Sequence, residues 1–321
     1  MRRMISQPVE KSHPESPSGR IDFQFRGLLY SLWRLGRIPL RRPGRMGKVT
    51  LVLSGGGLRG LAHIGVLKAM HAIGIPVHEY IGTSMGSLIC ALAAGGLGLK
   101  DLEQLALSLK SSDILDINPF DLVRRGIRVS SLHRGERLHQ YINRIIPIDS
   151  FKLLERPLLV NSVDLDRGEE VYFGSEGRDH IPIHDAVYAS CAIPGIFPPL
   201  KFEDSYYVDG GVGTNLPVHV AHQRKADLII AVNLGLPPLE HAGQPVAEGG
   251  MINIILQSTG IMMRRILQLQ LREYYEYPLI LIEPRATSRR TFDFEETDRS
   301  IRAGERAALN VLRDHPLLSL I

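Results

Sequence analysis

Two short apolar segments, each followed by a glycine-containing turn and a helix-forming stretch, constrain the fold of this chain more than any other feature. The first is KVTLVLS (48–54), which leads into three glycines (55–57). The second is VHEYIGT (77–83), which leads into Ser84 and a run of small residues. Continuous apolar runs of this length between helical patterns are typical of parallel strands that are buried on both faces. The two segments therefore predict an α/β fold.

The alternation of strand and helix patterns continues to the end of the chain. With 321 residues the chain is long enough to bury one large core. We expect a single domain over residues 49–321, folded as a three-layer α/β/α sandwich around a mostly parallel sheet. The further predicted strands are 156–165, 169–175, 205–211, 226–235 and 278–284, and the predicted helices are 60–73, 84–94, 251–275 and 295–313.

Residues 101–147 interrupt this alternation, because they show no strand pattern and predict only helices and loops. An insertion shortly after the helix that follows Ser84 is a natural place for a helical cap over a pocket. Helices that simply pack on the sheet would show the same pattern, and the sequence does not distinguish the two. We expect a helical cap.

The charge is divided unevenly along the chain. Residues 1–48 carry 11 Lys and Arg against 3 Asp and Glu, a net charge of +8, whereas residues 49–321 carry 27 against 31, a net charge of −4. We expect a basic arm over residues 1–47, with a disordered tail (1–20) and an amphipathic helix (21–42). The apolar and arginine-bearing faces of that helix suit either a membrane interface or packing on the domain.

The absence of certain sequence patterns limits which membranes, metals, cofactors and macromolecules we expect the chain to bind. No apolar run reaches about 18 residues and the start does not read as a secretory signal, so we expect a cytoplasmic protein that is peripheral on the inner face of a membrane where the arm binds lipid. Cys90 and Cys191 are too few for a disulfide framework, and no Cys/His cluster has zinc spacing. We expect no metal, no cofactor and no nucleic-acid partner. The sequence leaves the oligomeric state open.

The segment Gly82-x-Ser84-x-Gly86 has the spacing of a nucleophile elbow. In such an elbow the glycines allow a strand and a helix to approach closely around a sharp turn, and the serine projects at the end of the sheet. The pentapeptide alone is a weak pattern, because small residues are common at strand–helix turns. Its place between an apolar strand and a helix makes Ser84 the candidate nucleophile.

The segment LSGGGLRG (53–60) has two interpretations. It fits the G-x-G-x-x-G pattern of dinucleotide-binding loops, which also need an acidic residue about 20 positions later, near Glu79. Alternatively, Gly55, Gly56 and Gly57 expose backbone N–H groups at a helix N-terminus and form an oxyanion hole. A nucleotide loop would compete with Ser84 for one cavity, which favours the second interpretation.

The partner that takes the proton of Ser84 is not evident from spacing alone. His219, His222 and His315 follow the serine in the order used by α/β-hydrolases, but none has the setting of a catalytic loop, and His63 lies on the helix after the glycines. Asp209 lies at a strand end before two glycines, a pattern that an ordinary turn also has. The residues by themselves leave these possibilities open.

Three stretches taken together resemble the patatin-like phospholipase family: SGGGLRG (54–60), GTSMG (82–86) and DGG (209–211). The resemblance extends to ASCAIPGIFPPLKF, GTNLPV, ADLIIAVNLG and the NSVDLDRGEEVYF hairpin. Its core motifs span residues 51–222. It is closest to the bacterial branch that is similar to the catalytic domain of neuropathy target esterase, and it does not cover residues 1–47.

The resemblance implies a lipolytic serine hydrolase without a catalytic histidine, acting on phospholipid or other acyl esters through an acyl-enzyme. Ser84 matches the family's nucleophile and Asp209 its proton acceptor. Gly56 and Gly57 match the oxyanion-hole glycines, with Gly55 beside them. Arg59 matches a basic position that anchors the loop or counters the charge of a head group. The alternatives are a histidine-assisted esterase or acyltransferase, and a nucleotide-binding or scaffold protein.

Overall fold

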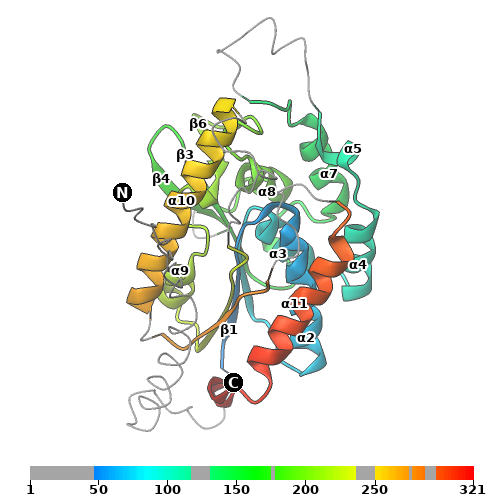
Figure 1. Ribbon diagram of the computed structural model, residues 1–321, viewed down its shortest axis with the longest axis vertical. Helices are drawn as coiled ribbons and strands as arrows, with labels where there is room; N and C mark the ends of the chain where they lie inside the picture. Colours follow the sequence, from blue (N-terminus) through cyan, green and yellow to red (C-terminus); the bar gives the residue numbers. More distant parts are fainter. Residues whose placement is uncertain (1–46, 117–130, 175–177, 236–249, 275–276, 286–293) are drawn as a thin grey trace, which may run out of the picture. The chain divides into compact units, whose positions relative to one another are not determined.

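A computed structural model describes residues 47–116, 131–174, 178–235, 250–274, 277–285 and 294–321 of the chain (Figure 1). The basic arm predicted for residues 1–47 lies outside the described residues except for Gly47. Residues 117–130, the middle of the segment predicted to form a cap, also lie outside the described residues.

The described residues from Val49 onward are organised around one eight-stranded sheet. Its hydrogen-bonded order is β5-β6-β3-β2-β1-β7-β8, with β4 paired to β3. Strands β3, β2, β1, β7 and β8 are parallel, whereas β4, β5 and β6 pair antiparallel. The strands are β1 (Val49–Leu53), β2 (Glu79–Thr83), β3 (Leu158–Asp164), β4 (Glu169–Phe173), β5 (Leu200–Phe202), β6 (Ser205–Asp209), β7 (Leu228–Val232) and β8 (Leu279–Ile282).

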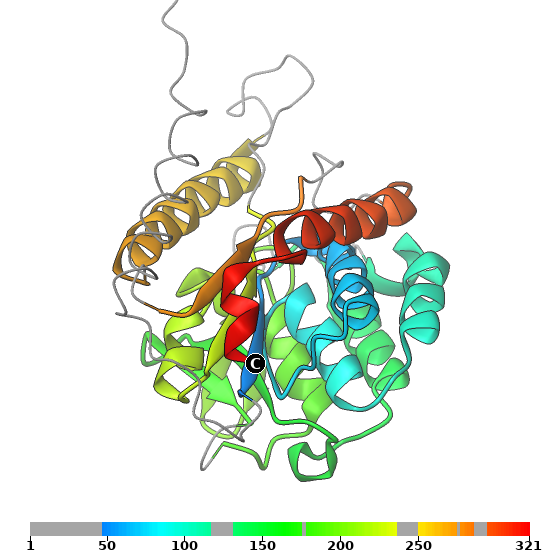
Figure 2. The same ribbon diagram turned by 90° about the horizontal axis from the view of Figure 1, so that it is seen from below.

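Helices cover both faces of this sheet, which confirms the predicted three-layer α/β fold. Figures 1 and 2 show α9 and α10 on one face and α2, α3 and α11 on the other. The α-helices are α2 (Ala62–Ala72), α3 (Met85–Ala94), α4 (Leu99–Ser108), α5 (Ser111–Ile114), α7 (Glu136–Ile145), α8 (Ile183–Cys191), α9 (Val218–Gln223), α10 (Gly250–Glu273) and α11 (Thr297–Leu312). The 3-10 helices are η1 (Gly57–Leu61), η3 (Phe151–Leu153), η4 (Gly210–Val212) and η7 (Pro316–Leu320).

The buried faces of the strands explain why the chain forms these layers. All five residues of β1, β2 and β7 are buried, as expected for strands enclosed on both sides. On the α9 and α10 side, one core cluster joins Val52, Ile81 and Ile229 from the strands to Val220 of α9 and Leu267 of α10. None of the helices in the described ranges is long and apolar enough to cross a bilayer.

The predicted strands and the four predicted helices are found within a few residues of their expected bounds, but α8 and β5 were not predicted. Helix α8 has only nine residues and β5 only three, so neither gives a clear apolar period. In the insertion, α4 packs on α2 and α11, and α7 packs on α8. The described part of the insertion therefore widens the helical layer on that face of the sheet.

Candidate active site

The pairing of β3 explains how residues 125 positions apart in the sequence reach one place. Thr83, the last residue of β2, is paired with Asn161 of β3, and Asp209, the last residue of β6, is paired with Ser162. Strand β4 occupies the other edge of β3 over residues 160–164. Strands β2 and β6 therefore share one edge of β3 and meet there end to end, with Ser84 following directly from β2.

The turn at Ser84 has the geometry of a nucleophile elbow. Ser84 has φ 53° and ψ −128°, a backbone conformation that is strained for a residue with a side chain. A Cβ atom at Gly82 would lie 2.4 Å from Ser87 Cα, and one at Gly86 would lie 2.4 Å from the carbonyl oxygen of Leu53. Both glycines are therefore required by the close approach of strand and helix.

Asp209 is buried beside Ser84. Its Oδ1 accepts a hydrogen bond of 2.8 Å from the backbone N–H of Gly211. Burial raises the pKa of Asp209 to about 6, and the hydrogen bonds from Gly211 and from the side chain of Ser84 oppose that rise. Asp209 is therefore a stronger base than a solvated aspartate, yet it is largely ionised at neutral pH.

The glycine-rich loop lies next to the elbow, because β1 and β2 are parallel neighbours that end together. A Cβ atom at Gly55 would lie 3.0 Å from Ser84 Cβ. The Gly55 N–H donates to Asn215 Oδ1 at 3.1 Å. Within the described part of the chain, the N–H groups of Gly56 and Gly57 have no acceptor. Of the three predicted glycines, Gly55 has an N–H group that is bonded to a side chain.

Arg59 is buried and holds the loop rather than facing solvent. Its guanidinium donates to the carbonyl oxygens of Leu234 at 3.2 Å and Gly235 at 2.9 Å, just beyond the end of β7. Burial lowers the pKa of Arg59 to about 10, so the side chain stays charged at neutral pH. Of the two roles suggested for this position, its contacts support the anchoring of the glycine-rich loop.

Three polar residues that the sequence did not single out hold this arrangement together. Ser190 accepts a hydrogen bond of 2.8 Å from the N–H of Ser84 and donates one of 2.5 Å to the carbonyl oxygen of Asn161. Asn161 in turn donates to Thr83 Oγ1 at 3.0 Å. Asn215, which binds Gly55, was visible only as part of the GTNLPV stretch. Their spacing carries no local signal, because each partner is distant in sequence.

Cys191 also lies at this site. The sequence suggested only a small buried side chain, and both cysteines are indeed buried and free. Burial, followed by the charge of Asp209, raises the pKa of the Cys191 thiol, while hydrogen bonds with Ser84 and Ser87 oppose the rise. The group is therefore a neutral thiol that packs against the candidate nucleophile.

The histidines weighed as bases are engaged in other contacts. His63 Nε2 donates to the carbonyl oxygen of Ser54 at 2.8 Å, and burial lowers its pKa to about 4. His219 contacts the rings of Tyr172 and Tyr274, and His222 stacks on Tyr277. His315 accepts from the N–H of Leu317 in the final 3-10 turn. The contacts described for His63, His219 and His222 do not include Ser84.

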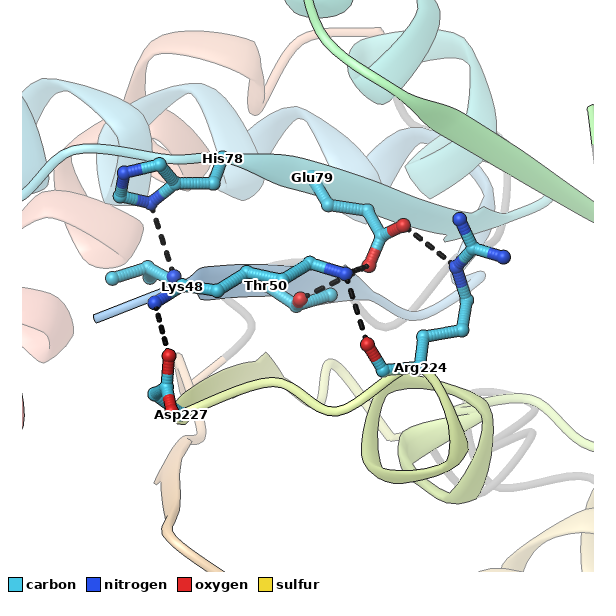
Figure 3. Close-up of polar contacts among 7 residues, drawn as sticks. Lys48, Thr50, His78, Glu79, Arg224 and Asp227 are labelled. Atoms are coloured by element: carbon cyan, nitrogen blue, oxygen red, sulfur yellow. Dashed lines mark hydrogen bonds and ion pairs between the residues drawn. The ribbon is translucent and has the colours of Figure 1, made fainter. Parts of the chain in front are cut away.

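Glu79, the acidic residue that a dinucleotide site would need, lies at the other end of β2 from Ser84. Its buried carboxylate contacts Lys48 Nζ at 2.8 Å and Arg224 Nε at 2.6 Å, and it accepts a hydrogen bond of 3.1 Å from Thr50 Oγ1 (Figure 3). These contacts join β1, β2 and the end of α9. Glu79 thus forms a structural ion pair with Lys48 and Arg224. It is not placed to bind the ribose of a dinucleotide at the Ser84 end of the sheet.

Replacing Glu79 by alanine is expected to lower the free energy of unfolding by about 3 kcal/mol, the lower end of the range for a broken buried ion pair. The lower end applies because the side chains of Lys48 and Arg224 are about one-third exposed and can reach water. Urea denaturation measures this change. Glu103→Ala, which breaks a pair with Lys68 in which both side chains are 29% exposed, should cost less than about 1 kcal/mol, because here the carboxylate itself reaches water. Equal losses in the free energy of unfolding for Glu79→Ala and Glu103→Ala would contradict the assignment of Glu79 to a buried ion pair.

One group of side chains has the composition of a metal site. His139, His184 and Asp185, from α7 and α8, have ligand atoms within 4.8 Å of one another. His139 Nε2 lies 2.6 Å from Asp185 Oδ1, and His184 Nδ1 lies 3.3 Å from Asp149 Oδ1. All three side chains are partly exposed and already contact one another or Asp149, so the group fits a surface polar network on the insertion side.

Comparison with known proteins bears on the family and the fold of the chain. The family model for patatin-like phospholipase matches residues 51–222, which include the glycine-rich loop, the elbow and Asp209. The crystal structure of VipD from Legionella pneumophila superposes with a TM-score of 0.50 at 16% identity, covering 84% of this chain and 67% of that one. That likeness concerns the fold.

Curated relatives of the chain include proteins from bacteria, a virus and an animal. An uncharacterized NTE family protein of Mycobacterium tuberculosis is 27% identical over 303 residues, which is 88% of this chain and 49% of the relative. A probable lipid hydrolase of Invertebrate iridescent virus 6 is 31% identical, covering 57% and 69%. Patatin-like phospholipase domain-containing protein 6 of Mus musculus is 32% identical, covering 58% and 13%. The chain thus spans about half the length of the mycobacterial relatives.

Proposed function

The chain belongs to the patatin-like phospholipase family, and on that premise we propose that it is a lipolytic acyl hydrolase that cleaves carboxylic esters with a Ser84–Asp209 dyad. The observation that carries the proposal is the end-to-end meeting of β2 and β6 on β3, which brings the Ser84 hydroxyl to a buried carboxylate. No histidine is required in this mechanism.

In the first half of the proposed reaction, Ser84 Oγ attacks the ester carbonyl carbon while its proton passes to the Asp209 carboxylate. The oxyanion that forms is stabilised by the N–H groups of Gly56 and Gly57 at the start of η1. The intermediate then expels the alcohol, which takes the proton from Asp209, and leaves an acyl group on Ser84. Gly55 and Arg59 position the loop in this proposal and do not contact the oxyanion.

In the second half, water attacks the acyl carbon and gives a proton to Asp209. Collapse of the second intermediate releases the carboxylic acid and returns the proton to Ser84 Oγ, so that the dyad is restored. Asp209 must be ionised to begin each half. Its raised pKa makes it a better proton acceptor than a solvated carboxylate without protonating it at neutral pH.

The substrate class follows from the family and from the burial of the site. Ser84 is 5% exposed and Asp209 is 7% exposed, so the reacting bond must enter a largely desolvated place. Apolar acyl chains suit such a place better than polar acyl groups. We therefore propose phospholipids, lysophospholipids or related acyl esters as substrates.

The pH dependence of turnover provides a first test of this function. We expect kcat/KM for a short p-nitrophenyl ester to rise about tenfold per pH unit below about pH 6 and to level above it, because only ionised Asp209 accepts the proton. A fluorophosphonate probe should label wild type and not Ser84→Ala. The double variant His219→Ala/His222→Ala should keep the profile and rate of wild type. Loss of activity in that variant would instead support a histidine-assisted esterase.

A further inference from the structure

Helix α10 carries an uncovered strip of large apolar side chains. Five of the eleven large hydrophobic residues exposed in the described part of the chain lie on this one helix, each 45–58% exposed. At 3.6 residues per turn they fall within an arc of about 120°. We call this surface the α10 strip, and it consists of Ile254, Ile255, Ile261, Met262 and Leu269.

The side of α10 opposite the strip is the side that packs on the domain. Leu267 and Tyr274 belong to the core cluster that includes β1, β2 and β7. Gln270 Nε2 donates to Thr214 Oγ1 at 2.9 Å. Helix α10 therefore has two apolar faces. One packs on the core of the domain, and the other is the exposed strip.

Helix α10 has a net positive charge, because it contains three arginines and one glutamate, Glu273, which is its last residue. The sequence from 250 to 272 contains Arg264, Arg265 and Arg272 and no aspartate or glutamate. Arg265 and Arg272 are exposed and fall within the same arc as the strip. An apolar face flanked by arginines, on a helix with a net positive charge, is the composition of helices that lie in the interface of an anionic membrane.

The first half of α10 lies at the end of the sheet that holds Ser84. Strands β7 and β8 are parallel, so α10 connects the carboxyl end of β7 to the amino end of β8 (Figure 1). Met263 Cε lies 2.5 Å from the position that a Cβ atom on Gly211 would occupy, two residues after Asp209. Val212, the next residue, is 39% exposed. The Asp209 loop therefore packs against the middle of α10, on the side of the helix opposite the strip.

We propose that the α10 strip docks the protein on an anionic lipid surface, with Ile255, Ile261 and Met262 entering the interface and the arginines at the head groups. The inference rests on the proposed function in one respect, since the lipid surface is taken as the place where the ester substrate is found. Docking there would bring the α10 side of the domain, on which the Asp209 loop packs, to the surface and shorten the path of a lipid into the site.

Two other occupants of the strip fit the charges less well. In a symmetric dimer the same strip would face itself, which would bring the arginines of both copies together. The arm of residues 1–47 is strongly basic and would be repelled by the same arginines. An anionic surface is the partner that complements both the apolar and the cationic side chains.

The test uses the full chain with one introduced cysteine that carries an environment-sensitive NBD fluorophore. Met262→Cys reports the strip, and Leu153→Cys, 71% exposed on η3 before the amino end of β3, is the matched control. The native cysteines are buried and leave the label to the new site. With equimolar phosphatidylglycerol–phosphatidylcholine vesicles, we expect several-fold brighter emission at position 262, little change at 153, and reversal by high salt.

Other outcomes overturn the proposal. If the protein sediments with the vesicles while emission at position 262 stays constant, a different surface such as residues 1–47 binds the lipid. If emission at 262 rises with protein concentration in the absence of vesicles, the strip binds a second copy. If the protein does not sediment with the vesicles, the strip is not a lipid-binding surface.

A second measurement separates docking from chemistry. The double variant Ile255→Asp/Met262→Asp should lose at least about tenfold in hydrolysis of phospholipid in vesicles, because it places carboxylates at an anionic interface, while its turnover of a soluble ester stays within twofold of wild type. Ser84→Ala labelled at position 262 should still brighten with vesicles. If wild type hydrolyses no ester but position 262 brightens, the proposed function fails and the docking inference stands.

Discussion

Replacing Asp209 by asparagine is expected to lower kcat for a soluble ester by about 10³- to 10⁴-fold, the loss typical when the base of a nucleophile is removed. The amide can still accept the hydrogen bond from the Gly211 N–H, so the loop is retained, but it cannot take the proton of Ser84. Ser84→Ala should lose as much activity, and the double variant should lose no more than either single variant, because the two residues act as one unit. Retention of most activity by Asp209→Asn would exclude the dyad.

The same substitution is expected to stabilise the protein at neutral pH. The pKa of Asp209 is raised from 3.8 to about 6 in the folded state, so the folded protein holds this proton more tightly than the unfolded chain. Stability of wild type therefore falls as pH rises from about 4 to about 6, by up to about 3 kcal/mol, and stays lower above that range. Asparagine is neutral, so Asp209→Asn removes the free-energy cost of burying an ionised carboxylate. Urea denaturation should find Asp209→Asn more stable than wild type at pH 8 and no more stable at pH 4.

Replacing Gly86 by alanine is expected to lower the free energy of unfolding by about 3 kcal/mol or more. In an ordinary helix this change stabilises by about 1 kcal/mol, because alanine is the better helix former. Here a Cβ atom would lie 2.4 Å from the carbonyl oxygen of Leu53 and 2.6 Å from that of Ser54. These are backbone atoms at the end of a buried strand, so the clash is relieved only by moving β1 away from α3.

The control for this prediction is Gly98→Ala. Gly98 has φ −64° and ψ 151°, which suit any residue, and a Cβ atom there would meet only the Asp101 carboxylate at 3.3 Å. We expect its effect on stability to stay within about 0.5 kcal/mol. Displacement of β1 by Gly86→Ala would also move the glycine-rich loop that follows it, so any folded fraction should lose ester turnover. A Gly86→Ala protein with the stability and turnover of wild type would contradict the elbow geometry.

The sequence allows the fold and part of the site to be predicted, and the limit lies where contacts become non-local. The strands and the elbow follow from apolar runs and glycine spacing, which act over a few residues. The hydrogen bond from Gly55 to Asn215 spans 160 positions, and that from Ser84 to Ser190 spans 106. Such pairs depend on the register of strands that are far apart in the chain. For the same reason the sequence could not show that Gly55 is already bonded, or that Glu79 binds Lys48 and Arg224.

The position of β2 and β6 on one edge of β3 has a consequence for how the chain tolerates change. The offset between the nucleophile and its proton acceptor is set by two consecutive residues, Asn161 and Ser162, whose spacing is fixed by the backbone itself. Within the connections that join β2 to β3 and β3 to β6, α3 and α8 are needed at the site, because α3 begins at the Ser84 turn and Ser190 of α8 binds the Ser84 N–H. The other parts of these connections can change in length or accept inserted modules while the reacting atoms keep their distance, provided that no residue is added to or removed from β3.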